Sequence, residues 1–520
     1  MALTTLLHLV ASIGVLGCIC HYIIQKIHFR AKYKFPNPVP GLPIVGNMLQ
    51  VPKEDSRMYF AKLAKQYGEM YTLKLGTNRW VFLNSSRVVN DIMEKRASIY
   101  VSRQNLPMAG DIVSGGNRLL FLPHNELWKR ERKIMHETLG PASKDRFAPS
   151  QDIETRTLLH DYLTRPEQWH HSHSRYSSSV IMNVVFGRRT KLGDKTVNDV
   201  VDLQEHFLKL LEPGASFIDA FPILMKTPIP QSWQPWRWWG DTEYRRTKKV
   251  FEIEMDRLLQ HEKNGTASDC WMSQLIRSGK DKEFTRDQLL FMAGTLIEAG
   301  TDTTRISLNQ LAAGSALFPD WIERARKELD AVCGSNAERL PVPEDAPSLP
   351  LIRAAAKESL RWNPSLGEIA HSLTQDDSYE GYHFPAGTNV TWNHWAIAMD
   401  PNEYPEPERF YPDRFLNEDL DKPTKGHFGF GVGEFAPYQG GYTSGRRVCA
   451  GYVVANRNLF LSISRLVYCF DFLPVEGHPI PVGKPFSTRI MNAPFQIKIR
   501  VRSPAHEALI RRECTSAAFD

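Results

Sequence analysis

The sequence predicts a mostly α-helical fold with a small β-sheet region, preceded by an N-terminal transmembrane helix. Apolar residues recur at helical spacing from about residue 55 to about residue 472 of the 520-residue chain, whereas strand-like alternation is confined to short segments. Many helices and few strands favour one helical domain that carries a small sheet. The net charge of +6 is mild and no block of like charges occurs, which argues against nucleic-acid binding.

The first segment, residues 1–25, is the predicted transmembrane anchor. From Ala2 to Gln25 it contains no Asp, Glu, Lys or Arg, and a helix of about 20 apolar residues spans a bilayer core. Basic residues follow at positions 26, 30, 32 and 34, which places that end on the cytoplasmic side. A cleaved signal peptide would carry its basic residues before the apolar stretch, so we expect a retained single-pass anchor.

Behind the anchor, residues 26–45 form a basic and proline-rich linker, which we expect to be a stiff, extended strap. No internal repeat interrupts the chain after it, so a single catalytic domain is expected over 46–502, with a loosely ordered tail over 503–520. Seven cysteines without paired spacing indicate a reducing compartment.

Within this domain the expected elements follow from periodicity. Helical spacing predicts helices over 56–67 and 86–96 and near 197–212 and 241–262, while alternation predicts a hairpin from 70–75 and 80–83 and strands at 390–392 and 495–500. Four tryptophans occur over 233–239, between two of the helices. This segment either dips into the membrane interface, where indoles are favoured, or packs as a loop on the core.

Cys449 marks the candidate cofactor site. It precedes an apolar pattern typical of a helix, and a helix N-terminus stabilises a thiolate. Gly445 and Gly451 flank it and let the backbone approach a large flat ligand, while Arg446 and Arg447 can pair with carboxylates on that ligand. These features fit a haem held by one cysteine sulfur. The alternative is a structural cysteine buried in a turn.

A second candidate site lies on the helix predicted over 291–304. Ala299 and Gly300 leave the backbone bare on one side, which makes room for a diatomic molecule, and Asp302 and Thr303 add a carboxylate beside a hydroxyl. Such a groove can relay protons to a reduced oxygen species. The alternative is a helix with a tolerated glycine and polar residues on its wet face.

Two further pairs share a helical face. Glu358 and Arg361, three residues apart, can form a bidentate ion pair that holds a third group, for which Arg414 is the candidate and Arg409 its competitor. Trp128 and Arg132, four residues apart, can both donate to a carboxylate. The alternatives are a surface ion pair in the first case, and a core tryptophan beside a solvated arginine in the second.

Together and in this order, these motifs resemble those of the cytochrome P450 family over essentially the whole chain. The resemblance implies the cytochrome P450 fold, heme b as cofactor and Cys449 as its axial ligand. It further implies that Trp128, Arg132, His371 and Arg447 bind the haem propionates, although the family often has arginine at the position of His371. Asp302 and Thr303 would form the acid–alcohol proton relay, and Glu358, Arg361 and Arg414 would buttress the haem loop.

The chain looks most like fungal microsomal members, including those that act on phenylacetates and in secondary metabolism. This likeness implies a monooxygenase that inserts one oxygen atom from O2 into an apolar small molecule, in the endoplasmic reticulum membrane with its body in the cytosol. The partner would be NADPH–cytochrome P450 reductase. Basic residues such as Arg446, Arg457 and Lys425 would contribute to the surface that meets this partner. The substrate is expected to be a fungal secondary metabolite, with a small aromatic acid such as a phenylacetate as the alternative.

One departure from the family pattern lies between Gly433 and Arg446, where about a dozen residues from Glu434 onward interrupt the haem loop. Either Tyr442 replaces the phenylalanine of the family motif, or Phe430 folds back across an insertion. The segment is either a surface bulge or a translated intron. If the interruption disables the haem loop, the alternative function is that of a non-catalytic haem-binding remnant.

The expected walls of the substrate pocket are mainly apolar or small, which selects for shape. They are residues 106–122, 296–303, 365–369 and 486–490. Arg103 and Arg118 could meet a substrate carboxylate, but we expect both in solvated positions.

Overall fold

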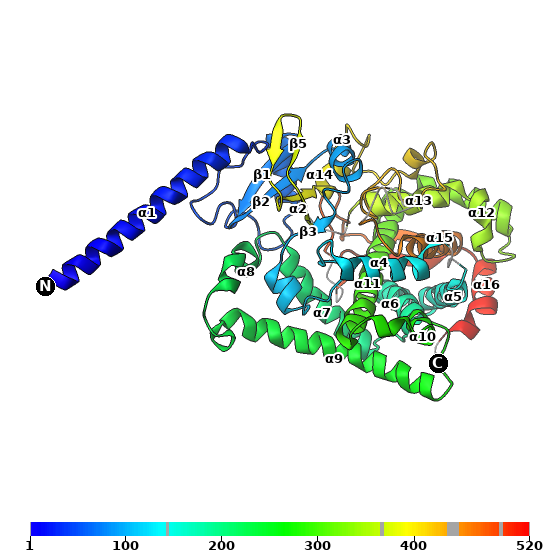
Figure 1. Cartoon of the computed structure of the whole chain (residues 1–520). Helices are drawn as coiled ribbons and strands as arrows, with labels where there is room; N and C mark the ends of the chain where they lie inside the picture. The colour runs from blue at the N-terminus through cyan, green and yellow to red at the C-terminus, as the bar shows by residue number, and fades with distance from the viewer. Residues whose placement is uncertain (1, 142–144, 365–368, 434–446, 488–491, 519–520) are drawn as a thin grey trace.

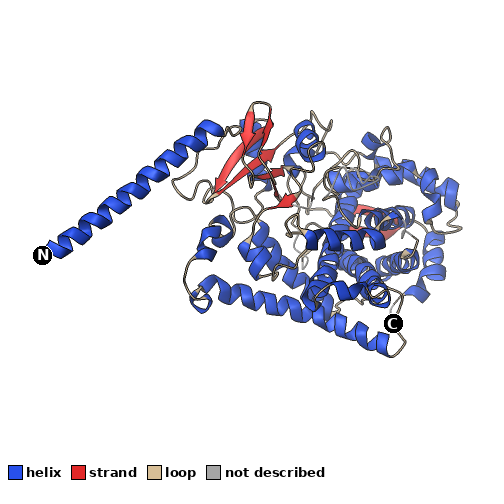
Figure 2. Ribbon diagram, viewed as in Figure 1, coloured by secondary structure: helices blue, strands red, loops and turns tan. Residues whose placement is uncertain are grey.

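The computed structural model describes residues 2–141, 145–364, 369–433, 447–487 and 492–518. Helices form most of the body and the largest sheet lies at one edge, close to the end of the N-terminal helix (Figures 1 and 2). The mostly helical class with a small sheet region is therefore confirmed. The α-helices are α1 (Ala2–Lys32), α2 (Arg57–Tyr67), α3 (Ser86–Val89), α4 (Glu126–Leu139), α5 (Ala148–Thr164), α6 (Trp169–Phe186), α7 (Lys195–Leu211), α8 (Phe217–Ala220), α9 (Pro235–Lys263), α10 (Trp271–Arg277), α11 (Arg286–Leu317), α12 (Asp320–Cys333), α13 (Pro350–Arg361), α14 (His394–Ala398), α15 (Tyr452–Cys469) and α16 (Pro504–Cys514).

Three small sheets occur in the described residues. The largest has the strand order β1-β2-β7-β4-β3, and β5 pairs with β6 and β8 with β9. Strands β1 and β2 form the predicted antiparallel hairpin, and β2 then pairs in parallel with β7, about three hundred residues later. The strands are β1 (Met70–Leu75), β2 (Asn78–Leu83), β3 (Ser102–Arg103), β4 (His371–Ser372), β5 (Asp377–Tyr379), β6 (Tyr382–Phe384), β7 (Asn389–Trp392), β8 (Phe470–Pro474) and β9 (Ile497–Val501).

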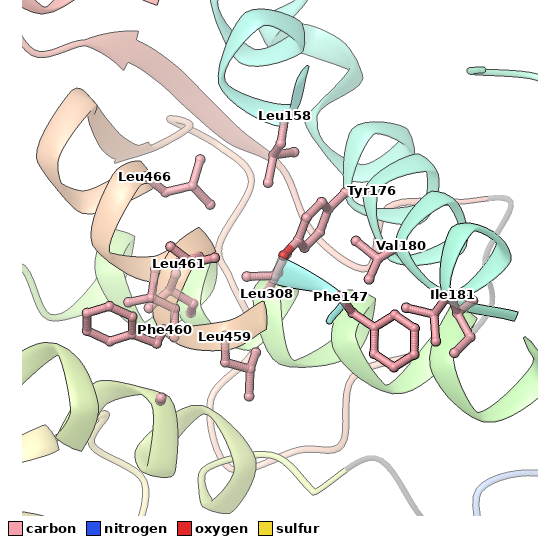
Figure 3. Packing of buried hydrophobic residues seen from close by; sticks show 14 of the residues in the cluster. Phe147, Leu158, Tyr176, Val180, Ile181, Leu308, Leu459, Phe460, Leu461 and Leu466 are labelled. Carbon is pink, nitrogen blue, oxygen red and sulfur yellow. The ribbon is translucent and has the colours of Figure 1, made fainter. Parts of the chain in front are cut away.

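The main core surrounds α11, which is buried along most of its length against α6, α15 and the first strand of the β8–β9 pair. Figure 3 shows side chains such as Tyr176 of α6, Leu308 of α11 and Leu461 of α15 meeting in this interior. Burial around most of its circumference explains why α11 has little amphipathic pattern. The helix is thereby held rigidly through the middle of the body.

Several predicted boundaries change in the structure. The helix expected over 86–96 is split into α3 and a π-helical turn, η1 (Asn90–Glu94). The tryptophan-rich segment is not one loop, because α9 already begins at Pro235. Trp233 and Trp238 are nevertheless well exposed, which argues against packing on the core for these two side chains.

The C-terminal prediction is wrong in its structural content. Residues 503–520 were expected to be loosely ordered, but α16 forms there and packs against α5. Leu509 and Ile510 are fully buried, and the Thr157 hydroxyl donates to the carbonyl of Ala517 over 2.9 Å. Two buried apolar side chains in a single turn hold the tail to the body.

The N-terminal segment is helical as predicted, and α1 continues as far as Lys32, projecting from the body (Figure 1). Over the part of the chain described here, however, no helix reaches the length and hydropathy needed to cross a membrane. The structure therefore does not support the transmembrane anchor expected for residues 1–25. The helix crosses from the predicted anchor into the predicted linker without a break, so the boundary at residue 25 is not a structural one.

Candidate active site

Cys449 lies just before the N-terminus of α15, as the sequence predicts. Its backbone N–H donates to the carbonyl of Phe430 over 2.8 Å. Its side chain is accessible, yet the surrounding chain desolvates it enough to raise the pKa of the thiol, which the backbone N–H of Gly451 partly offsets. The sulfur is therefore open to a ligand while the neighbouring chain shields it from bulk solvent.

The hydrogen bond to Phe430 also bears on the interrupted loop. It joins the two sides of the interruption, and Gly431 lies close to Val448. Phe430 therefore lies beside Cys449, as expected if it folds back across an insertion. Residues 434–446, including Arg446 and Tyr442, lie outside the described residues, so the choice between a bulge and a translated intron stays a prediction.

Four cationic or basic side chains gather beside the cysteine, and we call Arg103, Arg132, His371 and Arg447 the cation cluster. Arg103 and His371 are register partners of β3 and β4. The Arg447 guanidinium lies 4.3 Å from the ring centre of Trp128, and Arg132 donates to the carbonyl of Val448. The structure thus brings together every residue that the sequence predicted around the propionates.

The cluster is held by backbone carbonyls. Arg103 donates to the carbonyls of Ile369 and Ala370, Arg447 to those of Val101 and Leu122, and the Nδ1 of His371 lies 2.7 Å from the Tyr100 carbonyl. Among the described residues, no carboxylate pairs with Arg103 or Arg447. Burial, with repulsion from Arg132, lowers the pKa of Arg103 to about 10, and burial followed by Arg103 and Arg132 lowers the pKa of Arg447 well below its usual value.

His371 is also kept neutral, because burial and then the charge of Arg103 depress the pKa of its imidazole well below 6.5. Close cations without a carboxylate destabilise one another unless an anion joins them. A ligand with two carboxylates would relieve both the repulsion and the desolvation. The cluster, together with one accessible sulfur, therefore fits the haem predicted from the sequence.

Arg103 is the residue that sequence reasoning placed wrongly here. It was expected in solvent, but it is largely enclosed and its Nε has no hydrogen-bond partner. A signal was present, because Arg103 follows Val101 in a stretch that alternates as a short strand.

On α11, Thr295, Ala299 and Thr303 are four residues apart and form an accessible stripe on an otherwise buried helix. Ala299 therefore lies on an open face, as expected. Gly300 is half-buried, and a Cβ there would come within 2.5 Å of a side-chain carbon of Ile181 on α6. The expectation that Gly300 makes room for a diatomic molecule is corrected: this glycine allows α6 and α11 to pack closely.

Asp302 and Thr303 point to different surroundings. The Asp302 carboxylate is buried and accepts from the Nε of Arg305, one turn later, over 3.0 Å. The Thr303 hydroxyl donates to the carbonyl of Ala299 over 2.8 Å and is partly accessible. The two groups are adjacent in the chain, but only Thr303 belongs to the accessible stripe.

Glu358, Arg361 and Arg414 form a second buried group, which we call the E-x-x-R cluster. Arg361 binds Glu358 bidentately, with Nε–Oε2 and Nη2–Oε1 distances of 2.8 and 2.9 Å. Arg414 adds a contact of 3.3 Å to the same carboxylate. Arg361 also donates to the carbonyls of Ala398 and Pro407, so the cluster fastens the chain around residues 398–414 to α13. Arg414, not Arg409, is the third member.

A cleft with about 540 Å³ of empty space, part of it open to solvent, lies between the large sheet and the ends of α7 and α8. Leu106, Phe121 and Ile369 line it, which agrees with parts of the expected pocket walls. Residues 365–368 and 488–491 of those walls lie outside the described residues. Arg103 and Asp219 also line the cleft.

Arg118 was likewise expected in solvent, but its side chain is only 2% exposed and pairs with Glu298 of α11 over 3.2 Å. Sequence reasoning missed Glu298 as well. The signal was the run of four apolar residues that follows Arg118, because such a run indicates a buried segment.

Comparison with known proteins gives a consistent result. The family model described as Cytochrome P450 matches residues 36–500. Among curated proteins, the chain is 35% identical to cytochrome P450 monooxygenase virE of Hypocrea virens over 95% of this chain and 90% of that protein. It is 36% identical to cytochrome P450 monooxygenase verL of Clonostachys rogersoniana over 96% and 94% of the two chains. A solved zebrafish cytochrome P450 with abiraterone superposes with a TM-score of 0.65 at 21% identity, over 86% of this chain and all of that one.

Proposed function

The chain belongs to the cytochrome P450 family, and on that premise we propose that it inserts one oxygen atom from O2 into an apolar fungal secondary metabolite. Its general activity is that of the family, a haem-thiolate monooxygenase and hence an oxidoreductase. The observation that carries the proposal is the position of one accessible sulfur, Cys449, next to a cation cluster in which no carboxylate of the described residues pairs with Arg103 or Arg447.

In this proposal Cys449 would hold the haem iron through its sulfur, and Trp128, Arg132, His371 and Arg447 would hold the propionates, with Arg103 added to them. When bound, the haem supplies the activation of O2, which electron donation from the sulfur favours. The chain supplies the positive charge that neutralises two propionates, and the Phe430 carbonyl fixes the Cys449 backbone. Backbone donors and the apolar shell around a ligating sulfur set the iron's potential.

We propose Thr303 and Asp302 as the proton relay. The Thr303 hydroxyl is accessible on the stripe that faces away from the α6 contact, so it can pass a proton to oxygen on that side. Asp302 is held by Arg305 and would act behind Thr303, by passing protons from solvent to the hydroxyl. The carboxylate and the hydroxyl are then successive members of the relay, and the hydroxyl is the donor to oxygen.

Attachment to a membrane is part of the proposal. Along α1, Ile13, Leu16 and Ile27 are each more than half exposed, as are Trp233 and Trp238 before and within α9. Helix α1 and the start of α9 both lie at the left edge of the molecule in Figure 1. We propose that these two segments hold the enzyme on the endoplasmic reticulum membrane with its body in the cytosol, where NADPH–cytochrome P450 reductase supplies electrons.

The decisive experiment is the spectrum of the purified, reduced protein under carbon monoxide. We expect the Soret band of a thiolate-ligated haem, and its loss in Cys449→Ala. Cys469→Ala is the matched control, because Cys469 is buried in the core of α15 and should leave the band in place. A histidine-type band, or a protein that retains no haem, would instead support the non-catalytic remnant.

A further inference from the structure

Three buried polar side chains meet where the segment before α4 crosses α7 and α11. They are Arg118, Gln204 of α7 and Glu298 of α11, and all three are less than one-tenth exposed. Gln204 Nε2 donates to the backbone carbonyl of Glu298 over 3.0 Å, and Arg118 Nη2 lies 3.2 Å from Glu298 Oε1. The three side chains therefore form one group, which we call the polar triad.

The polar triad is not satisfied by its own contacts. Among the described residues, Arg118 Nε and Nη1 have no hydrogen-bond partner, and neither have Gln204 Oε1 and Glu298 Oε1. The ion pair is close but lacks hydrogen-bond geometry, so the 3.2 Å contact leaves Glu298 Oε1 open as an acceptor. Buried polar atoms are nearly always paired, so two open donors and two open acceptors in one place call for a partner.

The polar triad is connected with the cleft through two aromatic rings. The Arg118 guanidinium lies 3.5 Å from the ring centre of Phe207, whose ring centre is 5.5 Å from that of Phe121, and Phe121 lines the cleft. Glu298 also directly precedes the exposed Ala299 of α11. The polar triad is thus coupled to the cleft by ring contacts and to the accessible stripe by the chain.

We propose that the polar triad is a substrate-recognition site that binds a hydroxyl group of an otherwise apolar substrate, at a position away from the carbon that is oxidised. A hydroxyl both accepts and donates, so it can accept from Arg118 and donate to Glu298 or Gln204. The inference rests on the monooxygenase activity proposed above and adds the chemical class of the substrate.

The charges of the polar triad favour a neutral group over a carboxylate. Arg118 is already faced by the carboxyl group of Glu298, so an anionic substrate would meet repulsion at 298. Burial shifts both groups toward neutrality, because it raises the pKa of Glu298 and lowers the pKa of Arg118, and each shift is partly offset by the other residue. A site built for a hydrogen bond also discriminates against analogues that lack it.

The test compares three probes with one skeleton: decalin, 2-decalol and decalin-2-carboxylic acid. Binding to the full-length holoenzyme is measured by the haem spin-state difference spectrum and by calorimetry. We expect 2-decalol to bind roughly tenfold more tightly than decalin and than the acid, as one charge-assisted hydrogen bond provides. In Arg118→Met/Glu298→Leu, which removes both charges together, the preference for the alcohol should fall to about onefold while decalin still binds.

Gln204→Leu provides a milder variant that keeps the ion pair and should reduce the preference only in part. Arg245→Met, at an exposed position of α9, is the matched control and should keep the full preference. Equal binding of alcohol and hydrocarbon by the wild type, tighter binding of the acid, or no binding of the alcohol would each overturn the proposal. Loss of the thiolate-type band in the wild type would instead refute the monooxygenase activity, so the two failures can be told apart.

Discussion

The cation cluster and the E-x-x-R cluster are both groups of buried arginines, but they are completed in opposite ways. In the E-x-x-R cluster, the Glu358 carboxylate lies between Arg361 and Arg414, and each oxygen has a guanidinium partner. In the cation cluster, Arg103 and Arg447 have only backbone carbonyls as acceptors among the described residues. The E-x-x-R cluster is thus a finished network, in which every guanidinium has a carboxylate partner. The cation cluster is unfinished, because an anionic ligand would have to supply the negative charge that the described residues do not give to Arg103 and Arg447.

The difference separates groups that stabilise the fold from groups that bind. Removing the anion from a finished network leaves buried charge without compensation, which destabilises the fold strongly. Removing a cation from a repelling group relieves that repulsion and should leave the fold intact while it weakens ligand binding. Burial of an arginine alone therefore does not identify its role; the identity of its acceptors does.

The largest effect is expected when the finished network is broken. Glu358→Ala should lower the free energy of unfolding by about 3–5 kcal/mol, because two buried guanidiniums lose their carboxylate. Chemical denaturation of the purified holoenzyme, or the soluble yield if little protein folds, measures the change.

The matched control is Glu507→Ala, which breaks an exposed pair with Arg511 and should change stability by less than about 1 kcal/mol. If the two alanine variants were equally stable, the E-x-x-R cluster would not be a fold-stabilising group.

Asp219 extends the comparison to a single buried carboxyl that no cation of the described residues pairs with. Burial raises its pKa to about 7, an effect that the N–H of Met108 and the Ser216 hydroxyl partly offset, and its Oδ2 has no partner in the same part of the chain. Between pH 4 and 7 the unfolded chain has ionised this group while the folded chain keeps it protonated, so the wild type loses stability as pH rises. Asp219→Asn keeps the acceptor for Met108 but cannot ionise.

The stability of Asp219→Asn relative to the wild type should therefore increase from pH 5 to pH 8, by at most about 3 kcal/mol in the free energy of unfolding. Urea unfolding at the two pH values gives the difference directly. A gain of the same size at pH 5 and pH 8 would contradict the shifted ionisation.

In the cation cluster, Arg103→Met is expected to weaken haem binding and to leave the fold intact. Haem retention should weaken about tenfold, as for the loss of one charge-assisted contact, while the unfolding midpoint of the haem-free protein stays unchanged or rises. Transfer of haem to an excess of apomyoglobin measures retention. Arg103→Lys keeps the charge and should retain most of the affinity, whereas unfolding as severe as in Glu358→Ala would abolish the distinction between the two clusters.

The smallest effect is expected from deletion of residues 434–445, because this deletion removes no member of either cluster. The hydrogen bond from Cys449 to Phe430 already joins the flanks of this segment, so shortening it should change stability by about 1 kcal/mol or less. The reduced carbon monoxide spectrum should keep its thiolate band. Loss of that band would mean that the interrupting residues take part in holding the haem loop.

The local parts of the fold could be predicted from the sequence. The β1–β2 hairpin, the helix after Cys449 and the pair of Glu358 and Arg361 depend on residues close in the chain, where period and spacing are informative. The family resemblance then assembled distant positions such as Trp128 and His371, which spacing alone could not have placed together.

The rest depends on contacts that no local pattern encodes. The parallel pairing of β2 with β7 joins segments about three hundred residues apart. The sequence around Gly300 does not indicate that Ile181 of α6 packs against it. Likewise, the arginines at 103 and 118 are predicted to be solvated, because the segments that enclose them are distant in the chain. Average exposure of arginine was the wrong guide at these positions, because tertiary packing encloses both side chains beside distant polar groups.

Helix α16 completes the core beside α5, and the turn that follows it, η10 (Thr515–Ala517), accepts a hydrogen bond from Thr157 of α5. An apolar face of α5 stays uncovered until Leu509 and Ile510 pack against it. A fused group that crowds these two side chains should therefore keep that face exposed and lower the yield of folded enzyme.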